Sequence, residues 1–148
     1  MGKSEKIDFE TEMVKIMPQM LREISRRQEG ILTKGNIAVS DIIVMDALYE
    51  IGPCTMGNIA RMLNLTMSAA TVIVDRMIRN GLVKRGRSEK DRRVVNVELL
   101  KKGESIIKHV NSERKKMIKE MYSALSEQER KEYIRMIKKV YEGLRKRS

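Results

Sequence analysis

A short charged segment between two strand-like runs constrains this chain more than any other feature. Ser88-Glu89-Lys90-Asp91-Arg92-Arg93 separates the run Leu82 to Arg85 from the run Val94 to Leu99, and this arrangement is typical of a β-hairpin. Directly before it, Thr66 to Asn80 has the apolar spacing of an amphipathic helix, and Gly81 ends that helix. The order helix, strand, charged loop and strand predicts a winged helix-turn-helix. In that fold a helix enters the major groove of DNA, while the loop reaches phosphates or the adjacent minor groove.

The positive charge of the chain is concentrated in the predicted hairpin. The net charge of +11 at pH 7 favours a polyanionic partner, either nucleic acid or an anionic membrane surface. Six basic and two acidic residues lie between positions 84 and 93. Because they lie in a loop rather than along one helix face, the pattern favours double-stranded DNA over a bilayer. A solvated hairpin tip that protects a sheet edge from aggregation is the alternative interpretation.

Two short helices are predicted before the hairpin. Thr55 is placed to cap one that runs through Leu63, and Thr66 is placed to cap the next one. This is the spacing of a helix-turn-helix, although any small helical hairpin shows it too. Small neutral side chains on the outer face of the second helix allow close approach to base edges, and the arginines further along suit the sugar-phosphate backbone. The predicted DNA contacts of this helix are Thr66, Ser68, Ala69, Thr71, Val72, Arg76 and Arg79.

An amphipathic helix and a second, mostly apolar helix are predicted near the N-terminus. Apolar residues recur at helical spacing from Asp8 to about Gln28. Pro18 is expected to kink this helix or to restart it near Ile16, because proline lacks an amide donor. Ser40 is then placed to cap a helix over residues 41–50.

Two further helices with apolar stripes are predicted after the hairpin. One runs roughly from Gly103 to Leu125, and a capping box at 126–129 begins another that ends near Leu144. With the N-terminal helix, these stripes exceed what a small winged domain needs. We therefore expect a homodimer joined through both termini, with an intramolecular helical cap on a monomer as the alternative. The expected fold is mostly α with a small β-wing (α+β): an N-terminal dimerisation helix (1–35), a winged helix-turn-helix (36–101) and C-terminal dimerisation helices (102–148).

Several motifs of this chain resemble the MarR family of bacterial transcriptional regulators. They are Gly52-Pro53-Cys54-Thr55, Thr71, Asp75-Arg76-Met77, Asn80-Gly81-Leu82-Val83, Asp91-Arg92-Arg93 and Lys102-Gly103. The resemblance spans roughly residues 39–107, and the Asp-Arg-Arg segment after Gly-Leu-Val is its specific part. It implies that Arg93 enters the minor groove, that Asp91 orients Arg93, and that the helix face from Ser68 to Arg76 reads the major groove. The predicted contacts of the wing are Arg87, Lys90, Asp91, Arg92 and Arg93.

Two positions depart from the family pattern. Leu100 stands where threonine is common, so a helix cap is missing and the start of the next helix is left open. Val72 stands where relatives often carry a polar or basic residue, which affects the operator sequence rather than the docking mode. A carboxylate beside DNA is repelled unless it supports a guanidinium, and Asp91 is close enough in sequence to support Arg93.

The resemblance also implies how the protein works. It implies a homodimeric regulator, more commonly a repressor, that binds a palindromic site with half-sites about one turn (~34 Å) apart. It further implies a small, often aromatic or phenolic ligand between the dimer helices and the winged domain. A winged-helix module that binds DNA without sequence preference, or that binds a protein partner, is the alternative function.

The sequence lacks the motifs of several other protein classes. It has no Gly-rich phosphate loop, paired catalytic carboxylates or nucleophile signature, so we expect no enzyme and no catalytic residue. Cys54 and His109 are the single cysteine and histidine and offer no zinc-ligand spacing. We therefore expect no metal and no cofactor, and we interpret Cys54 as an inert turn residue. No apolar run of 18 residues and no apolar secretory stretch is present, which favours a cytoplasmic protein without a membrane partner.

Overall fold

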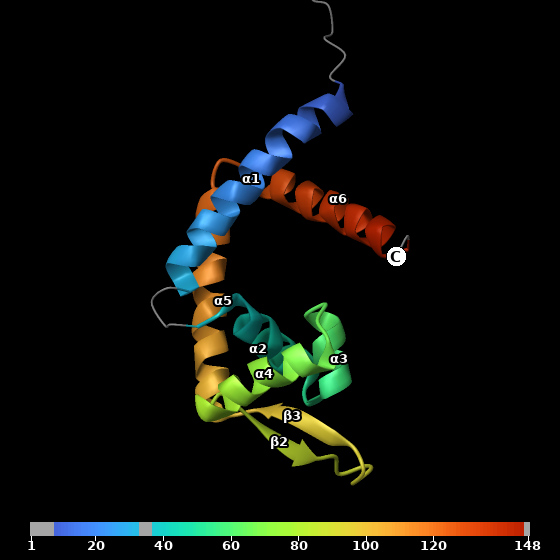
Figure 1. Cartoon of the computed structure of the whole chain (residues 1–148). Coiled ribbons are helices and arrows are strands. Elements are labelled where there is room, and N and C mark those ends of the chain that lie inside the picture. Colours follow the sequence, from blue (N-terminus) through green and yellow to red (C-terminus); the bar gives the residue numbers. More distant parts are fainter. Residues whose placement is uncertain (1–7, 33–36, 147–148) are drawn as a thin grey trace, which may run out of the picture. The chain divides into compact units, whose positions relative to one another are not determined.

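The protein is a helical chain with a small antiparallel wing (Figure 1). The computed structural model describes residues 8–32 and 37–146. In chain order, the elements are α1 (Phe9–Leu32), α2 (Val39–Ile51), β1 (Cys54–Thr55), α3 (Met56–Met62), α4 (Met67–Arg79), β2 (Val83–Arg87), β3 (Val95–Leu99), α5 (Lys101–Met121) and α6 (Glu127–Arg145). The predicted mostly α class with a β-wing is confirmed. The chain divides into two compact units, one ending at Ser112 and the other beginning at Glu113.

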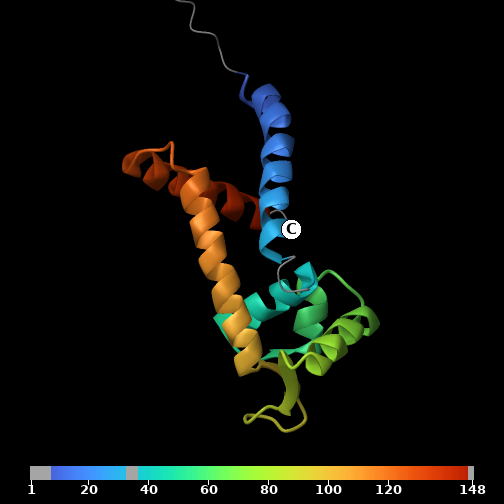
Figure 2. The same ribbon diagram turned by 90° about the vertical axis from the view of Figure 1, so that its left-hand side faces the viewer.

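The hydrophobic core of the first unit lies between α2, α3, α4, the sheet and the first turns of α5. Side chains from every one of these elements are buried, and the β2–β3 hairpin projects beyond the helices in both ribbon views (Figure 1, Figure 2). The amphipathic helix predicted from Thr66 to Asn80 is confirmed as α4, because Ala70, Val74 and Met77 are fully buried while Ile73 and Ile78 pack against the core. The opposite face of α4 is therefore the one directed to solvent.

The sheet has the strand order β1-β3-β2, and both strand pairs are antiparallel. Val83 pairs with Leu99 and Arg87 with Val95, so the second predicted strand is observed almost as expected and the first is shifted toward the loop. Arg87 consequently ends strand β2 instead of lying in the loop. Strand β1 was missed, because two residues are too few to show an alternating pattern. Their pairing partners, Val97 and Asn96, lie far along the chain.

Helix starts follow local capping chemistry at three of the predicted positions. The hydroxyl oxygens of Thr55 and Thr66 accept hydrogen bonds from backbone amides three residues later, each at 3.2 Å. Ser126 does the same for Glu129 at 3.3 Å, and the Glu129 carboxylate accepts from the Ser126 amide at 2.7 Å. These caps satisfy amides that an α-helix leaves without partners at its N-terminus. The predicted beginnings of α3, α4 and α6 are thus confirmed.

The Ser40 cap predicted for the second N-terminal helix was wrong, and the prediction that Pro18 kinks or restarts the first helix is contradicted only for the restart. Helix α2 begins at Val39 with Ala38 as its N-cap, and Ser40 lies inside the first turn. Helix α1 does not restart at its proline, since it runs uninterrupted from Phe9 to Leu32 with Pro18 inside. Pro18 lies on an exposed part of the helix, so the hydrogen bond that proline removes can be replaced by water.

The start of α5 is determined by close packing against the wing. A Cβ atom at Gly103 would lie 2.4 Å from the Leu82 carbonyl oxygen, so only glycine fits here. The Leu100 amide donates to the same carbonyl at 3.0 Å, and the Lys102 ammonium donates to the Asn80 carbonyl at 2.8 Å. The helix therefore begins at Lys101, before the predicted start, without a side-chain cap.

The second unit comprises the last turns of α5 and all of α6. Tyr122 and Tyr133 join the two helices, with ring centroids 5.2 Å apart and hydroxyl oxygens 3.3 Å apart. The hydrogen bond to Tyr133, together with burial, raises the pKa of Tyr122 to about 12. Helix α6 buries none of its residues. None of the helices in the described residues is long and apolar enough to cross a membrane.

Candidate nucleic-acid interface

The outer face of α4 presents small side chains near its N-terminus. Ser68 and Val72 are exposed, with Val72 at 65%, while Ala69 and Thr71 are half-buried. The Thr71 hydroxyl donates to the Met67 carbonyl at 2.8 Å, which leaves its oxygen lone pairs as acceptors for a base edge. Thr66 is exposed as the N-cap. The five small residues predicted as contacts thus lie on the first two turns of this helix.

The two arginines predicted on α4 differ in their surroundings. Arg79 is exposed in the last turn and forms no ion pair among the described residues. Arg76, predicted to contact the sugar-phosphate backbone from the outer face, has a protein partner in this structure. Its guanidinium pairs with the carboxylate of Asp41 on α2 and also donates to the Ser40 hydroxyl at 3.3 Å. Arg76 therefore connects α4 to α2.

The tip of the wing is ordered by hydrogen bonds to its own backbone. The Ser88 hydroxyl accepts from the Lys90 amide at 3.2 Å, and the Ser88 amide donates to the Val94 carbonyl at 2.9 Å. The Asp91 carboxylate accepts from the Arg93 amide at 2.9 Å. Asp91 was expected to support the Arg93 guanidinium, but the structure bonds it to the backbone instead. A carboxylate hydrogen-bonding two residues along its own chain forms an Asx-turn, so Asp91 shapes the loop.

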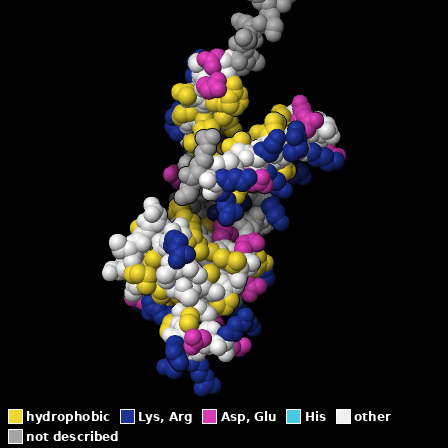
Figure 3. All heavy atoms as spheres, turned by 90° about the vertical axis from the view of Figure 1, so that its right-hand side faces the viewer, with side chains coloured by type: hydrophobic (Ala, Val, Ile, Leu, Met, Phe, Trp, Pro, Cys, Tyr) yellow, Lys and Arg dark blue, Asp and Glu magenta, His cyan; other side chains and the backbone are white. Residues whose placement is uncertain are grey.

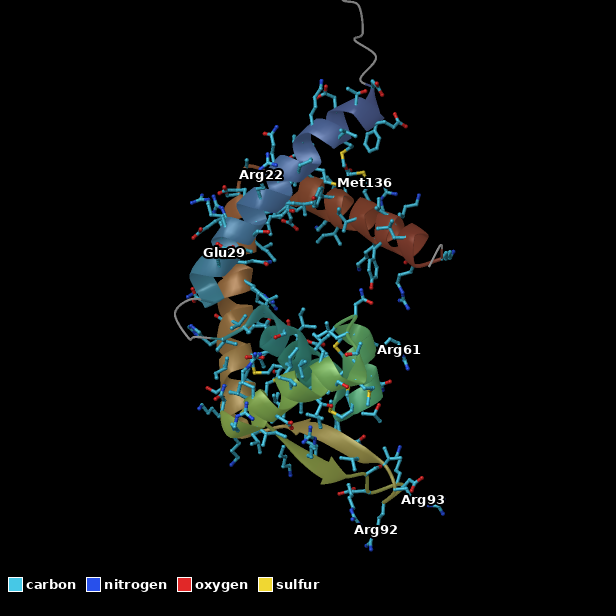
Figure 4. All side chains as sticks on the ribbon, in the orientation of Figure 1. Arg22, Glu29, Arg61, Arg92, Arg93 and Met136 are labelled. Carbon is cyan, nitrogen blue, oxygen red and sulfur yellow. The ribbon has the colours of Figure 1, made fainter. Side chains whose placement is uncertain are left out.

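The cationic side chains of the wing extend into solvent. Arg92 and Arg93 lie at the hairpin tip and point away from the sheet (Figure 4). Arg87 and Lys90 are also exposed, and none of the four is in an ion pair within the part of the chain that the structure describes. In the space-filling view, basic side chains gather at this end of the first unit (Figure 3). Unpaired cations on a narrow, projecting hairpin are suited to phosphates and to the minor groove.

One ion pair that the sequence did not reveal attaches the wing to α4, and another joins the two strands of the wing. Arg85 on β2 pairs with Asp75 on α4 at 2.8 Å, and Lys84 pairs with Glu98 on β3 at 3.0 Å. Gly86 makes room for this second pair, since a Cβ atom there would lie 2.6 Å from a Glu98 carboxylate oxygen. Two basic residues of the charged run thus serve the structure. Charge patterning alone does not distinguish them from Arg87, Lys90, Arg92 and Arg93, which form no ion pair with described residues.

The structure offers little for chemistry other than binding at this interface. Within residues 8–32 and 37–146, no group of three or more His, Cys, Asp or Glu side chains is arranged to hold a metal ion. Cys54 is buried at 5% exposure in β1, and burial raises the pKa of its thiol. A thiol with a raised pKa is a poor nucleophile near neutral pH.

Comparisons with known proteins identify the same region. Residues 37–95 match the model of the MarR family. The chain resembles the solved structure of a MarR family protein from Bacillus stearothermophilus, with 30% identity, a TM-score of 0.85, and coverage of 97% of this chain and 99% of that one. It is 29% identical to YsmB of Bacillus subtilis, an uncharacterised HTH-type transcriptional regulator, over 85% of this chain and 86% of that protein. Streptococcus pneumoniae FabT, solved in complex with DNA, shares the fold with 22% identity and a TM-score of 0.80, over 93% of this chain and 99% of that one.

Proposed function

Because the chain belongs to the MarR family of winged helix-turn-helix transcriptional regulators, which bind DNA, we propose that it recognises one palindromic operator as a homodimer. The observation that carries the proposal is that an ion pair joins α4 and the wing on one surface. The 2.8 Å pair between Asp75 and Arg85 connects them, and both present exposed groups beyond it. One protomer is thus equipped to contact two neighbouring grooves of the same duplex.

In this proposal, the small side chains on the outer face of α4 recognise the base sequence. The Ser68 hydroxyl can donate to or accept from a base edge, the Thr71 oxygen can accept from one, and Val72 supplies methyl groups that suit a thymine methyl. Arg79 and the wing cations Arg87, Lys90, Arg92 and Arg93 neutralise phosphates and occupy the flanking minor groove. Base contacts and phosphate contacts therefore come from different residues, which mutagenesis can separate.

The homodimer is supported by apolar surface on the terminal helices. Large apolar side chains that are more than half exposed lie on α1 and on α6. They are Phe9, Val14, Ile16 and Leu21 on α1 and Ile134, Val140, Tyr141 and Leu144 on α6. Monomeric proteins rarely expose large contiguous apolar patches. A second copy of the chain that covers these faces gives the two-fold symmetry that a palindrome requires.

The dimer has a direct test in α6. Replacing Val140 and Leu144 by Glu puts charge on exposed apolar positions without disturbing a buried one. We expect this variant to sediment as a monomer and to lose operator affinity, while Lys138→Ala with Lys139→Ala remains a dimer. Sedimentation of the Glu variant as a dimer would contradict the proposed interface.

Repression and ligand release complete the proposal. A dimer that covers a promoter excludes the transcription machinery, so repression follows from occupancy alone. A small aromatic or phenolic ligand releases the operator if it binds better to a dimer whose α4 helices are wrongly spaced, because a ligand shifts a conformational equilibrium only by its differential affinity. Titration of a panel of phenolic compounds against the protein bound to its operator tests this, and affinity unchanged by every compound would count against release.

Selection of bound sequences from random duplex DNA tests the central part of the proposal. We expect a palindrome with half-sites about one turn (~34 Å) apart. Thr71→Ala is expected to change the preferred base at one position, whereas Arg93→Ala weakens binding to all recovered sites. Equal affinity for every duplex would instead favour a DNA-binding module without sequence preference.

A further inference from the structure

A buried carboxylate lies where α4 meets α2. Asp41 is 3% exposed, and no other charged side chain in the described residues is buried. Its carboxylate accepts hydrogen bonds from the Arg76 guanidinium and, at 3.4 Å, from the Ala38 amide at the start of α2. An unpaired buried carboxylate is costly, so Asp41 requires the arginine in this position.

The ion pair restricts α4 in a way that its apolar contacts do not. Hydrophobic burial of Ala70, Val74 and Met77 holds the helix against the core, but such contacts are non-directional. A charge-assisted hydrogen bond has a narrow range of distance and angle. Because Arg76 also donates to the Ser40 hydroxyl at 3.3 Å, two directional contacts fix the rotation of α4 relative to α2.

This restraint acts on the same helix as the proposed base contacts. Thr71 and Val72 lie five and four residues before Arg76, little more than one helical turn away. A rotation or a slide of α4 that broke the ion pair would move these side chains relative to base edges. The side chain of Arg76 is also only 40% exposed, and its guanidinium is already hydrogen-bonded to Asp41 and Ser40.

We propose that Asp41 is a positioning residue for operator recognition, which holds α4 at the rotation that reads bases and keeps Arg76 away from DNA phosphates. The inference rests on the proposed sequence-specific function and adds a specificity determinant outside the DNA-contacting surface. It separates Arg76 from Arg79, three residues later on α4, which forms no such pair among the described residues.

The test compares Asp41→Asn, Arg76→Gln and the double variant, each as the full chain and below its measured melting temperature. Affinity is measured for the selected palindrome and for random duplex over a range of salt concentrations. We expect each single variant to lose roughly tenfold in the ratio of specific to random affinity, the size of one mismatched base pair. The double variant is expected to lose no more than either single one, because one interaction is removed in all three.

Salt dependence and a conservative variant separate positioning from other roles. The slope of log affinity against log salt stays at the wild-type value in Arg76→Gln, whereas it falls by about 0.9 per lost phosphate contact in the matched control Arg79→Gln. Arg76→Lys, which keeps the charge, recovers part of the lost specificity. A wild-type specificity ratio in both single variants would overturn the inference, as would a reduced slope in Arg76→Gln. If the wild-type chain itself selects no palindrome, the proposed sequence-specific function is wrong. If it selects one but the variants keep its specificity, only the positioning role of Asp41 is wrong.

Discussion

Replacing Arg92 and Arg93 by alanine is expected to make DNA binding much less sensitive to salt. Both guanidinium groups lie at the tip of the β2–β3 hairpin and form no ion pair with described residues, so their removal leaves no buried charge. Each phosphate that a protein neutralises contributes about 0.9 to the slope of log affinity against log salt. Two cations per wing and two wings per dimer give a slope that is shallower by at most about 3.6.

This slope converts into a large difference in affinity. Between 50 and 200 mM salt, the wild-type protein would lose roughly 150-fold more affinity than the variant if all four contacts form, and roughly tenfold more if half of them form. Fluorescence anisotropy of a labelled operator duplex at several salt concentrations measures both slopes.

A matched control separates the effect of where the positive charge lies from the effect of how much charge is removed. Lys138→Ala with Lys139→Ala removes the same number of charges from exposed positions of α6, and alanine favours helix. We expect this control to keep the wild-type slope to within about one phosphate contact. Identical slopes for the wing variant and the wild type would refute the assignment of these arginines to DNA. An equal decrease of the slope in the wing variant and the control would show that net charge alone causes the effect.

Three further predictions concern the fold around the interface. Gly103→Ala places a methyl group against the Leu82 carbonyl, 2.4 Å away, and is expected to lower the free energy of unfolding by about 1–3 kcal/mol in urea titration. Cys54, buried and with its pKa raised by burial, is expected to resist iodoacetamide at pH 8 until the protein unfolds, so rapid alkylation of native protein would contradict its placement. The Tyr122 pKa of about 12 lies above that of an unfolded tyrosine, so its contribution to stability is complete below about pH 10 and is lost as pH rises toward 12. Ultraviolet titration should show this late-titrating tyrosine, and Tyr133→Phe should move its pKa down.

The features that could be predicted from the sequence are those encoded locally. A hydroxyl residue before an apolar stripe located the starts of α3, α4 and α6, because the cap and the amide it bonds are three residues apart. The α4 core face also followed from the spacing of its own residues. The charged run predicted the wing because its two flanking strands pair with each other.

The features that were missed depend on residues far apart in the chain. Arg76 has the spacing of an outer-face cation, yet its partner Asp41 lies 35 positions earlier. Strand β1 exists because Cys54 and Thr55 meet β3 about forty residues later, and α5 begins early because the wing packs against Gly103. At α2, the sequence predicts Ser40 as the cap, whereas the helix begins after Ala38, whose amide donates to the Asp41 carboxylate. Pairings of this kind are set by the fold as a whole, and local spacing does not contain them.

The arrangement of α4 and the wing on DNA can be measured with chemical probes. Because Cys54 is buried, the variants Arg93→Cys and Ser68→Cys each carry one accessible thiol for a tethered iron chelate that cleaves nearby DNA. We expect the probe at position 93 to cut within the minor groove flanking each half-site. The probe at position 68 should cut across the adjacent major groove. Cleavage spread evenly along the duplex from both positions, or none from position 93, would contradict the claim that one protomer binds two neighbouring grooves.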